Sequence, residues 1–226
     1  MKKTFYLLIV AILSSAFASN QLYAQQNIES DIKVIRALYQ KAQENIKIQT
    51  GNKVDKNQLQ ITTQKSWLDR GNQTDTYNFY FHEKTGVLGK DGNPLYQLSF
   101  VRIKSSGAVR KCSEEYLFNE KGELVFYFIN FKENLGAGNE MEIRLYYKDG
   151  KTIRELIKQT DKFTKKVTER NSINILYATE VEHPEKAVAN IKSLFENAVN
   201  QWMYEPSVDP DNPEYEIPVR HIDGGY

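Results

Sequence analysis

Cysteine and histidine are the side chains in this sequence that could supply a nucleophile and its base. There is one cysteine, Cys112, and there are three histidines, His82, His183 and His221. A catalytic thiol needs a base within hydrogen-bond reach and an exposed, electropositive setting. Cys112 lies in an alternating, strand-like stretch and has none of the local motifs of cysteine hydrolases. We therefore interpret Cys112 as a small hydrophobic side chain rather than a nucleophile.

Serine nucleophiles, phosphate loops and metal sites also lack their sequence motifs. No serine lies in a Gly-x-Ser-x-Gly elbow. Gly86, Gly89 and Gly92 are regularly spaced but lie in a hairpin connection, not in front of a helix. The histidines form no paired ligand motif, and the acids from Asp209 to Asp223 depart from the spacing of a calcium loop. The sequence therefore predicts no catalytic residue, no metal site and no cofactor.

Pairs of carboxylates leave a second catalytic possibility open. Glycosidases need two acids at a suitable separation. Glu114, Glu115, Glu133 and Glu142 lie on or beside expected strands. A chain with 29 acidic residues meets this requirement easily, so no pair is singled out. A hydrolase that acts through carboxylates on the sheet face stays open as an alternative.

Aromatic side chains on alternating strand positions indicate a candidate binding surface. We predict that Tyr80, His82, Tyr127, Arg144 and Tyr146 share one face of a sheet. Phenol rings offer flat apolar area and a polar tip, which suits sugar rings or peptides. Tyrosine is also commonly half-buried without any binding role. The alternative is therefore that these rings pack against the second helix or a proline-rich tail.

Two amphipathic helices are expected to position these strands. Between residues 28 and 48 apolar residues recur in steps of three and four, with Asn27 as the N-cap and Gly51 as the end. The second helix begins at Pro184, which suits the first helical position. Its apolar stripe consists of Ala187, Val188, Ile191, Leu194, Phe195, Ala198, Val199 and Trp202.

Between the helices the apolar residues alternate with polar ones, and turn residues recur at short intervals. Asp91-Gly92, Gly107, Gly122 and Asp149-Gly150 suit tight hairpins, so successive strands are expected to pair. The expected strands are 58–64, 74–82, 96–104, 109–118, 123–131, 141–147 and 152–159, of which the last also fits a helical spacing. Residues 160–168 are interpreted as a solvated ribbon or edge strand.

One expected strand differs from the others because nearly every residue in it is apolar. The stretch from Leu124 to Phe131 shows no alternation, so we expect it to be central and covered on both faces. The sequence thus predicts the α+β class. We expect an antiparallel β-meander sheet of about six to seven strands, with an N-terminal and a C-terminal amphipathic helix packed on it.

The chain is expected to form one domain over residues 25–204. Because Cys112 is the only cysteine, an intramolecular disulfide is impossible. Residues 205–226 hold four prolines, which exclude a helix and predict an extended C-terminal tail.

The N-terminus has the three zones of a secretory signal peptide. Lys2 and Lys3 precede an apolar run from Phe5 to Leu13, and small residues follow. The run is shorter than the roughly 20 residues that a membrane-spanning helix needs. We predict a signal peptide over residues 1–24, cleaved after Ala24, with Ala18 as the alternative site. The mature form is expected to be periplasmic or extracellular, without a membrane anchor.

The charge balance argues against nucleic acid as a partner. The chain has 30 Lys and Arg and 29 Asp and Glu, and loss of Lys2 and Lys3 changes the formal net charge from +1 to −1. Nucleic-acid-binding domains usually carry a clustered basic face. We therefore expect an exported, non-catalytic binding or interaction module of the bacterial envelope. Its partner is an envelope protein, a peptide or a glycan.

Overall fold

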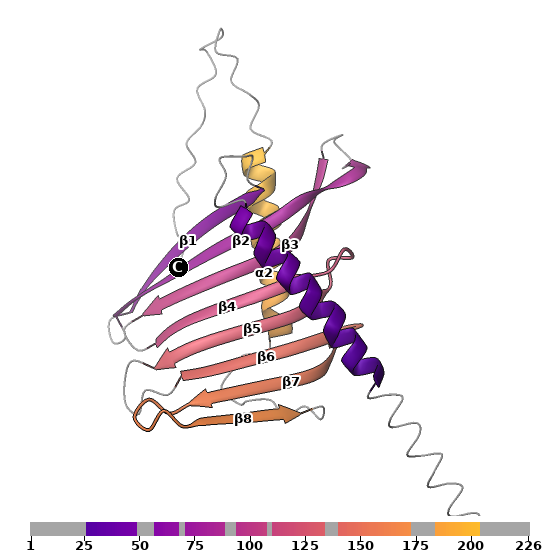
Figure 1. Ribbon diagram of the computed structural model, residues 1–226. Coiled ribbons are helices and arrows are strands. Elements are labelled where there is room, and N and C mark those ends of the chain that lie inside the picture. The colour runs from indigo at the N-terminus through magenta and orange to yellow at the C-terminus, as the bar shows by residue number, and fades with distance from the viewer. Residues whose placement is uncertain are drawn as a thin grey trace, which may run out of the picture.

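The computed structural model describes residues 26–48, 57–67, 71–88, 94–107, 110–133, 140–172 and 184–203. These residues form an eight-stranded antiparallel sheet in sequence order, with a helix across each face (Figure 1). The strands are β1 (Gln58–Trp67), β2 (Gly71–Leu88), β3 (Pro94–Gly107), β4 (Arg110–Phe118), β5 (Leu124–Glu133), β6 (Glu140–Lys148), β7 (Lys151–Thr160) and β8 (Val167–Ser172).

The α+β class and the antiparallel meander are confirmed, but six to seven strands is too low a number. β8 is the additional strand, and it pairs with β7 at one edge of the sheet. The side chains from Val167 to Asn171 are all exposed, so this strand has no buried face to produce an alternating pattern. The stretch 152–159, which also fitted a helix, is part of β7.

Two turns of the meander show the backbone conformation that their residues favour. Asp149 and Gly150 connect β6 to β7 with φ values of 51° and 71°, in the left-handed region. Gly122, in the β4–β5 turn, has a φ of 75°. In the same turn the side-chain oxygen of Asn119 accepts hydrogen bonds from the backbone N–H groups of Lys121 and Glu123. These turns fix β4 beside β5 and β6 beside β7.

Helix α2 (Pro184–Met203) covers one face of the sheet. Ile191, Phe195 and Val199 of this helix are buried against alternate residues of the central strands. We call this side the α2 face; it includes Phe79, Val101, Tyr116, Tyr127 and Leu145. The predicted start at Pro184 is confirmed, and so is the apolar stripe, except that the side chain of Trp202 lies outside the described residues.

The N-terminal helix, residues 26–48, crosses the opposite face of the sheet (Figure 1). Its buried residues Ile32, Ile35 and Ile46 belong to a second apolar cluster. We call this side the N-helix face; it includes Tyr80, Phe100, Leu117, Phe126 and Tyr146. The two helices therefore pack on opposite faces of the sheet.

Coverage on both faces explains why nearly every residue of β5 from Leu124 to Phe131 is apolar. This strand lies between β4 and β6, as expected for the stretch from Leu124 to Phe131. Its side chains alternate between the two clusters, with Tyr127 and Ile129 on the α2 face and Phe126 on the N-helix face.

Several predictions concern segments outside the described residues. These are the signal peptide over residues 1–24, the tail over residues 205–226, and the positions of Gly51, His183 and His221. Neither helix in the described part of the chain is long and apolar enough to cross a membrane.

Candidate functional site

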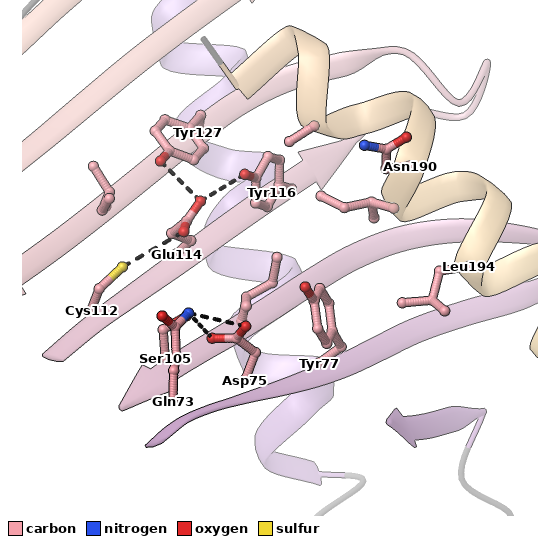
Figure 2. A pocket seen from close by; sticks show the side chains of 14 residues that line it. Gln73, Asp75, Tyr77, Ser105, Cys112, Glu114, Tyr116, Tyr127, Asn190 and Leu194 are labelled. Carbon is pink, nitrogen blue, oxygen red and sulfur yellow. Dashed lines mark hydrogen bonds between the residues drawn. The ribbon is translucent and has the colours of Figure 1, made fainter. Parts of the chain in front are cut away.

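A cavity of about 590 Å³ lies between the α2 face of the sheet and helix α2 (Figure 2). Strands β2 to β5 provide its floor, and α2 provides one wall through Ala187, Asn190, Ile191 and Leu194. Cavities of this size bind small organic molecules in many proteins. The side chains of its floor therefore define the candidate site.

Strand geometry brings the polar floor residues together. Side chains two positions apart on a strand point to the same face, so Cys112, Glu114 and Tyr116 of β4 all face α2. In the antiparallel register Tyr116 pairs with Tyr127 of β5. The two tyrosine rings have centroids 5.0 Å apart. An acid at the middle position of this strand is thereby surrounded by donors from its own strand and from the next.

The carboxylate of Glu114 accepts three hydrogen bonds in the floor of the cavity (Figure 2). The hydroxyls of Tyr116 and Tyr127 donate to the same oxygen, Oε2, at 2.7 and 3.1 Å. The thiol of Cys112 donates to Oε1 at 3.6 Å. Three donors fix the orientation of this carboxylate.

The two tyrosines that hold Glu114 are almost completely inaccessible. Tyr116 and Tyr127 are each 1% exposed. Burial raises the pKa of both hydroxyls, and the nearby carboxylate of Glu114 raises it further. Both groups therefore keep their protons and remain donors at neutral pH.

Asp75 of β2 is the second acid in the cavity wall. It is 6% exposed, and both of its carboxylate oxygens accept hydrogen bonds from the side-chain amide of Gln73, at 2.9 and 3.2 Å. The pKa of Tyr77 is raised by burial, then by the charges of Asp75 and Glu114. Tyr77 is thus close enough to both acids for their charges to raise its pKa.

The cavity has a negative character over the part of its lining that the structure describes. Asp75 and Glu114 are the lining residues with a formal charge at neutral pH, and the described lining holds no lysine, arginine or histidine. Ile103, Ile129 and Leu194 add apolar surface. The site therefore combines two acids with aliphatic walls.

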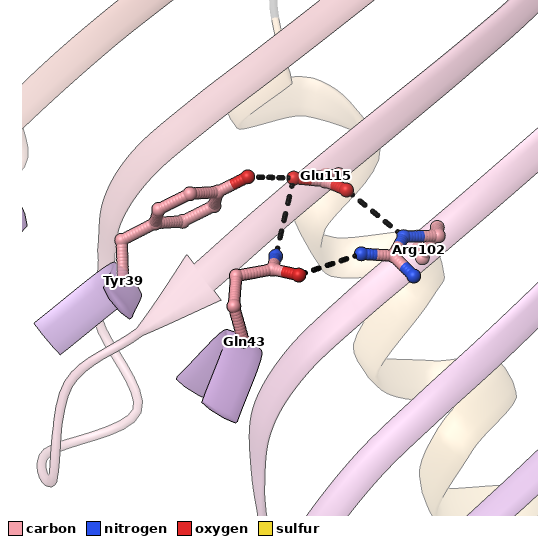
Figure 3. Close-up of polar contacts among 4 residues, drawn as sticks. All are labelled: Tyr39, Gln43, Arg102 and Glu115. Carbon is pink, nitrogen blue, oxygen red and sulfur yellow. Dashed lines mark hydrogen bonds and ion pairs between the residues drawn. The ribbon is translucent and has the colours of Figure 1, made fainter. Parts of the chain in front are cut away.

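A separate polar cluster joins the N-terminal helix to the N-helix face of the sheet (Figure 3). Glu115, which is 7% exposed, accepts hydrogen bonds from Tyr39, Gln43 and Arg102. Arg102 also donates to the side-chain oxygen of Gln43 at 2.9 Å. The members of this cluster satisfy one another, so we assign it to helix attachment rather than to ligand binding.

The five predicted binding residues do not share one face. Tyr80 and Tyr146 are buried in the cluster beneath the N-terminal helix, 7% and 3% exposed, and Arg144 lies over the Phe128 ring of the same cluster. His82 is exposed and lines a smaller cavity of about 310 Å³ beside that helix, together with Tyr80. Tyr127 lies on the α2 face, in the larger cavity.

The division of these five residues has a physical reason. Where nearly every residue of a strand is apolar, as from Leu124 to Phe131 in β5, the sequence does not show which side chains point to which face. In the observed register Tyr127 pairs with Leu145 of β6. Tyr127 therefore lies on the face opposite to that of Arg144 and Tyr146. The prediction of one open aromatic surface is therefore wrong, because each face of the sheet is covered by a helix.

Sequence reasoning missed most of the larger cavity. Gln73, Asp75, Tyr116 and Asn190 received no functional role, and Glu114 stood only among several acids. A usable signal is present in β4, where Cys112, Glu114 and Tyr116 occupy alternate positions and so place an acid between two weakly polar side chains. An acid on an otherwise apolar strand face indicates a polar site within the core.

The structure separates Cys112 from His82, which is the one of the three candidate bases that lies in the described residues. Cys112 lines the cavity under α2, whereas His82 lines the one beside the N-terminal helix. Among the described residues no three of His, Cys, Asp and Glu lie close enough to hold a metal ion.

Comparison with known proteins leaves the function to be argued from this geometry. No family model matches the sequence, and no curated protein and no solved structure shows a significant match to the chain.

Proposed function

We propose that the protein is an exported, non-catalytic binding module of the bacterial envelope, and that its ligand site is the cavity between the sheet and α2. The observation that carries this proposal is the cavity of about 590 Å³ in which Asp75, Glu114 and Asn190 converge among aliphatic side chains. Ligand sites are typically concave and mostly apolar, with a few polar groups that fix orientation. The signal peptide predicted over residues 1–24 supports a location outside the cytoplasm.

The walls of the cavity are suited to binding because they are held in place before a ligand arrives. Phe195 of α2 packs against Phe79 and Phe81 of β2, with ring centroids 5.8 and 5.2 Å apart. Lys192 donates a hydrogen bond to the backbone oxygen of Gly122 at 2.7 Å. A site whose residues are already ordered loses less entropy on binding.

A carboxylate hydrolase is the alternative, and the presence of Asp75 and Glu114 in one cavity is the observation that favours it. Binding is preferred because both oxygens of Glu114 already accept hydrogen bonds from Tyr116, Tyr127 and Cys112. A fixed carboxylate that keeps a free lone pair suits a ligand that donates a hydrogen bond, whereas a general acid must donate a proton of its own.

The proposal is tested by filling the cavity. Ala187 lines it, whereas Ala189, two residues further along α2, is exposed. The Tm of the wild-type protein (the unchanged chain) and of the variants Ala187→Trp and Ala189→Trp is measured by thermal unfolding. Each measurement is repeated in the presence of sugars, amino acids, short peptides and amines. Circular dichroism confirms that each variant is folded.

We expect at least one compound to raise the Tm of the unchanged chain and of Ala189→Trp but not that of Ala187→Trp. A panel without any such compound contradicts the proposal. Turnover of an envelope polymer that disappears in Glu114→Gln would favour the hydrolase instead.

A further inference from the structure

We propose that the cavity under α2 binds a small organic cation, with an ammonium or guanidinium group on an aliphatic stem. This inference depends on the proposed function of the cavity as a ligand site. It starts from a difference between the two acids inside the cavity and four ion-paired acids outside it.

Outside the cavity, four acids of the described residues are paired with cations. Glu115 lies against Arg102 with 2.9 Å between Oε1 and Nε, and Glu142 lies 2.7 Å from Arg144. Further ion pairs join Asp31 to Lys148 and Glu29 to Arg154. In these four pairs the fold itself supplies the positive charge.

Inside the cavity the two acids are held by neutral donors. Asp75 is bonded to the Gln73 amide, and Glu114 to two tyrosine hydroxyls and a thiol. Such donors orient the carboxylates but leave their charge uncompensated. A carboxylate that is largely removed from water is stable only when its charge is balanced or well solvated. The described lining therefore provides two negative charges and no positive one.

The aliphatic side chains of the cavity fit the aliphatic stem of such a cation. Ile103, Ile129, Ile191 and Leu194 offer aliphatic contact to a methylene stem. The amide of Asn190 reaches toward the cavity from α2 (Figure 2), and its oxygen can accept a further hydrogen bond from an ammonium group. The half-buried ring of Tyr77 adds a π-face for the cation.

The inference is tested with three probes that share a carbon stem of the same length. Cadaverine carries two ammonium groups, pentanediol two hydroxyls and glutarate two carboxylates. Binding to the full chain is measured by isothermal titration calorimetry, at low and at physiological salt. The variants are Glu114→Gln and Asp75→Asn, with Glu142→Gln as the control because Glu142 is an ion-paired acid outside the cavity.

We expect cadaverine to bind while pentanediol and glutarate do not. Loss of a charged hydrogen-bond partner should weaken cadaverine roughly ten- to hundredfold in Glu114→Gln and in Asp75→Asn. Glu142→Gln should leave the affinity unchanged. The thermal midpoint of each variant shows whether it is folded. If one of the two charge variants does not fold, the other one tests the prediction.

Different failures point to different errors. Binding of pentanediol or glutarate as tight as that of cadaverine, no binding of cadaverine, or unchanged affinity in both charge variants overturns the assignment of a cation. If any probe binds and Ala187→Trp abolishes its binding, the cavity remains the ligand site. If cadaverine binds equally well to Ala187→Trp, the cavity is not the site, and both proposals are wrong.

Discussion

The hydroxyl of Tyr39, on the N-terminal helix, donates a hydrogen bond to Oε2 of Glu115, which lies 76 residues further along the chain on β4 (Figure 3). The same carboxylate pairs with Arg102 of β3 through its other oxygen. Burial, then the bond to Glu115, raises the pKa of the Tyr39 hydroxyl, so it remains a donor. The N-terminal helix is thus attached by a polar contact of fixed geometry as well as by its isoleucine stripe.

The first prediction concerns this attachment. Tyr39→Phe should lower the free energy of unfolding by about 1 kcal/mol, because it removes one hydrogen bond and leaves an acceptor in place. Glu115→Leu should cost about 2 to 3 kcal/mol, because Arg102 then loses its charge partner at a site that is only partly exposed. Urea unfolding followed by circular dichroism measures both values.

A double-mutant cycle checks that the two residues act through each other. The combined variant should be less destabilised than the sum of the single variants by about 1 kcal/mol. Gln40→Ala, at an exposed position of the same helix, is the control and should change stability little. Strict additivity of Tyr39→Phe and Glu115→Leu would show that the contact contributes nothing.

The second prediction concerns alkaline pH. In the folded state the pKa values of Tyr116 and Tyr127 are raised above the ordinary value of about 10 for a tyrosine, mainly by burial. A group with a raised folded pKa contributes stability that is complete below its unfolded pKa and is lost as pH rises above it. The free energy of unfolding should therefore fall above about pH 10, by up to about 1.4 kcal/mol per pH unit for each tyrosine.

Replacement of both tyrosines tests this origin. Tyr116→Phe and Tyr127→Phe should each cost about 1 kcal/mol at neutral pH, because Glu114 loses a donor. The double variant should lose stability less steeply above pH 10 than the unchanged chain. Tyrosinate absorbance should show that these two hydroxyls titrate only when the protein unfolds. An identical alkaline slope in both proteins would contradict the assignment.

The fold could be predicted from sequence wherever a segment carries its own pattern. Residues 28–48 and Pro184–Met203 have helical stripes, and seven strands have either alternation or an apolar run between turns. β8 lacks such a pattern because its described side chains are all exposed, and it exists through its backbone pairing with β7. Local composition therefore identified the elements that bury side chains, whereas for β8 it offered only the edge-strand alternative over residues 160–168, which overlaps the observed strand at Val167 and Thr168.

The candidate site could not be predicted to the same degree, because it depends on which face α2 covers. Alternation in β4 shows that Glu114 and Tyr116 share a face, but Asp75 comes from another strand, and the cavity roof comes from a helix about 75 residues further on in the chain. Because nearly every residue of β5 from Leu124 to Phe131 is apolar, the strand lacks the alternation that would have placed Tyr127 on the correct face. Register and helix placement are tertiary properties that no single segment specifies.

The third prediction concerns acid pH. The side-chain hydrogen bond from Arg154 to Glu29 lowers the pKa of Glu29 below the ordinary value of a glutamate. A group with a lowered folded pKa contributes stability that is present above its unfolded pKa and is lost as pH falls through the folded value. The unchanged chain should thus lose more stability between neutral pH and around pH 3 than Glu29→Gln does.

Chemical unfolding at the two pH values measures this difference. Glu44→Gln, at an exposed position of the same helix, is the matched control and should keep the acid sensitivity of the unchanged chain. At neutral pH, Glu29→Gln should be the less stable protein, because the Arg154 side chain is only 7% exposed and loses its charge partner. Equal acid sensitivity in Glu29→Gln and the unchanged chain would rule out this ion pair as a source of it.

The fourth prediction concerns the attachment of α2, on which the cavity depends. Phe195 is 3% exposed and contacts the rings of Phe79 and Phe81, so Phe195→Ala should lower the free energy of unfolding by about 3 to 5 kcal/mol. Glu196→Ala changes the next residue, which is exposed, and should cost less than about 0.5 kcal/mol.

Hydrogen exchange shows which part of the protein Phe195→Ala destabilises. If only the amides of α2 lose protection while those of β4 and β5 keep it, the helix detaches from an intact sheet, and ligand binding under α2 should be lost with it. Wild-type protection of α2 in Phe195→Ala would show that this contact does not hold the cavity wall.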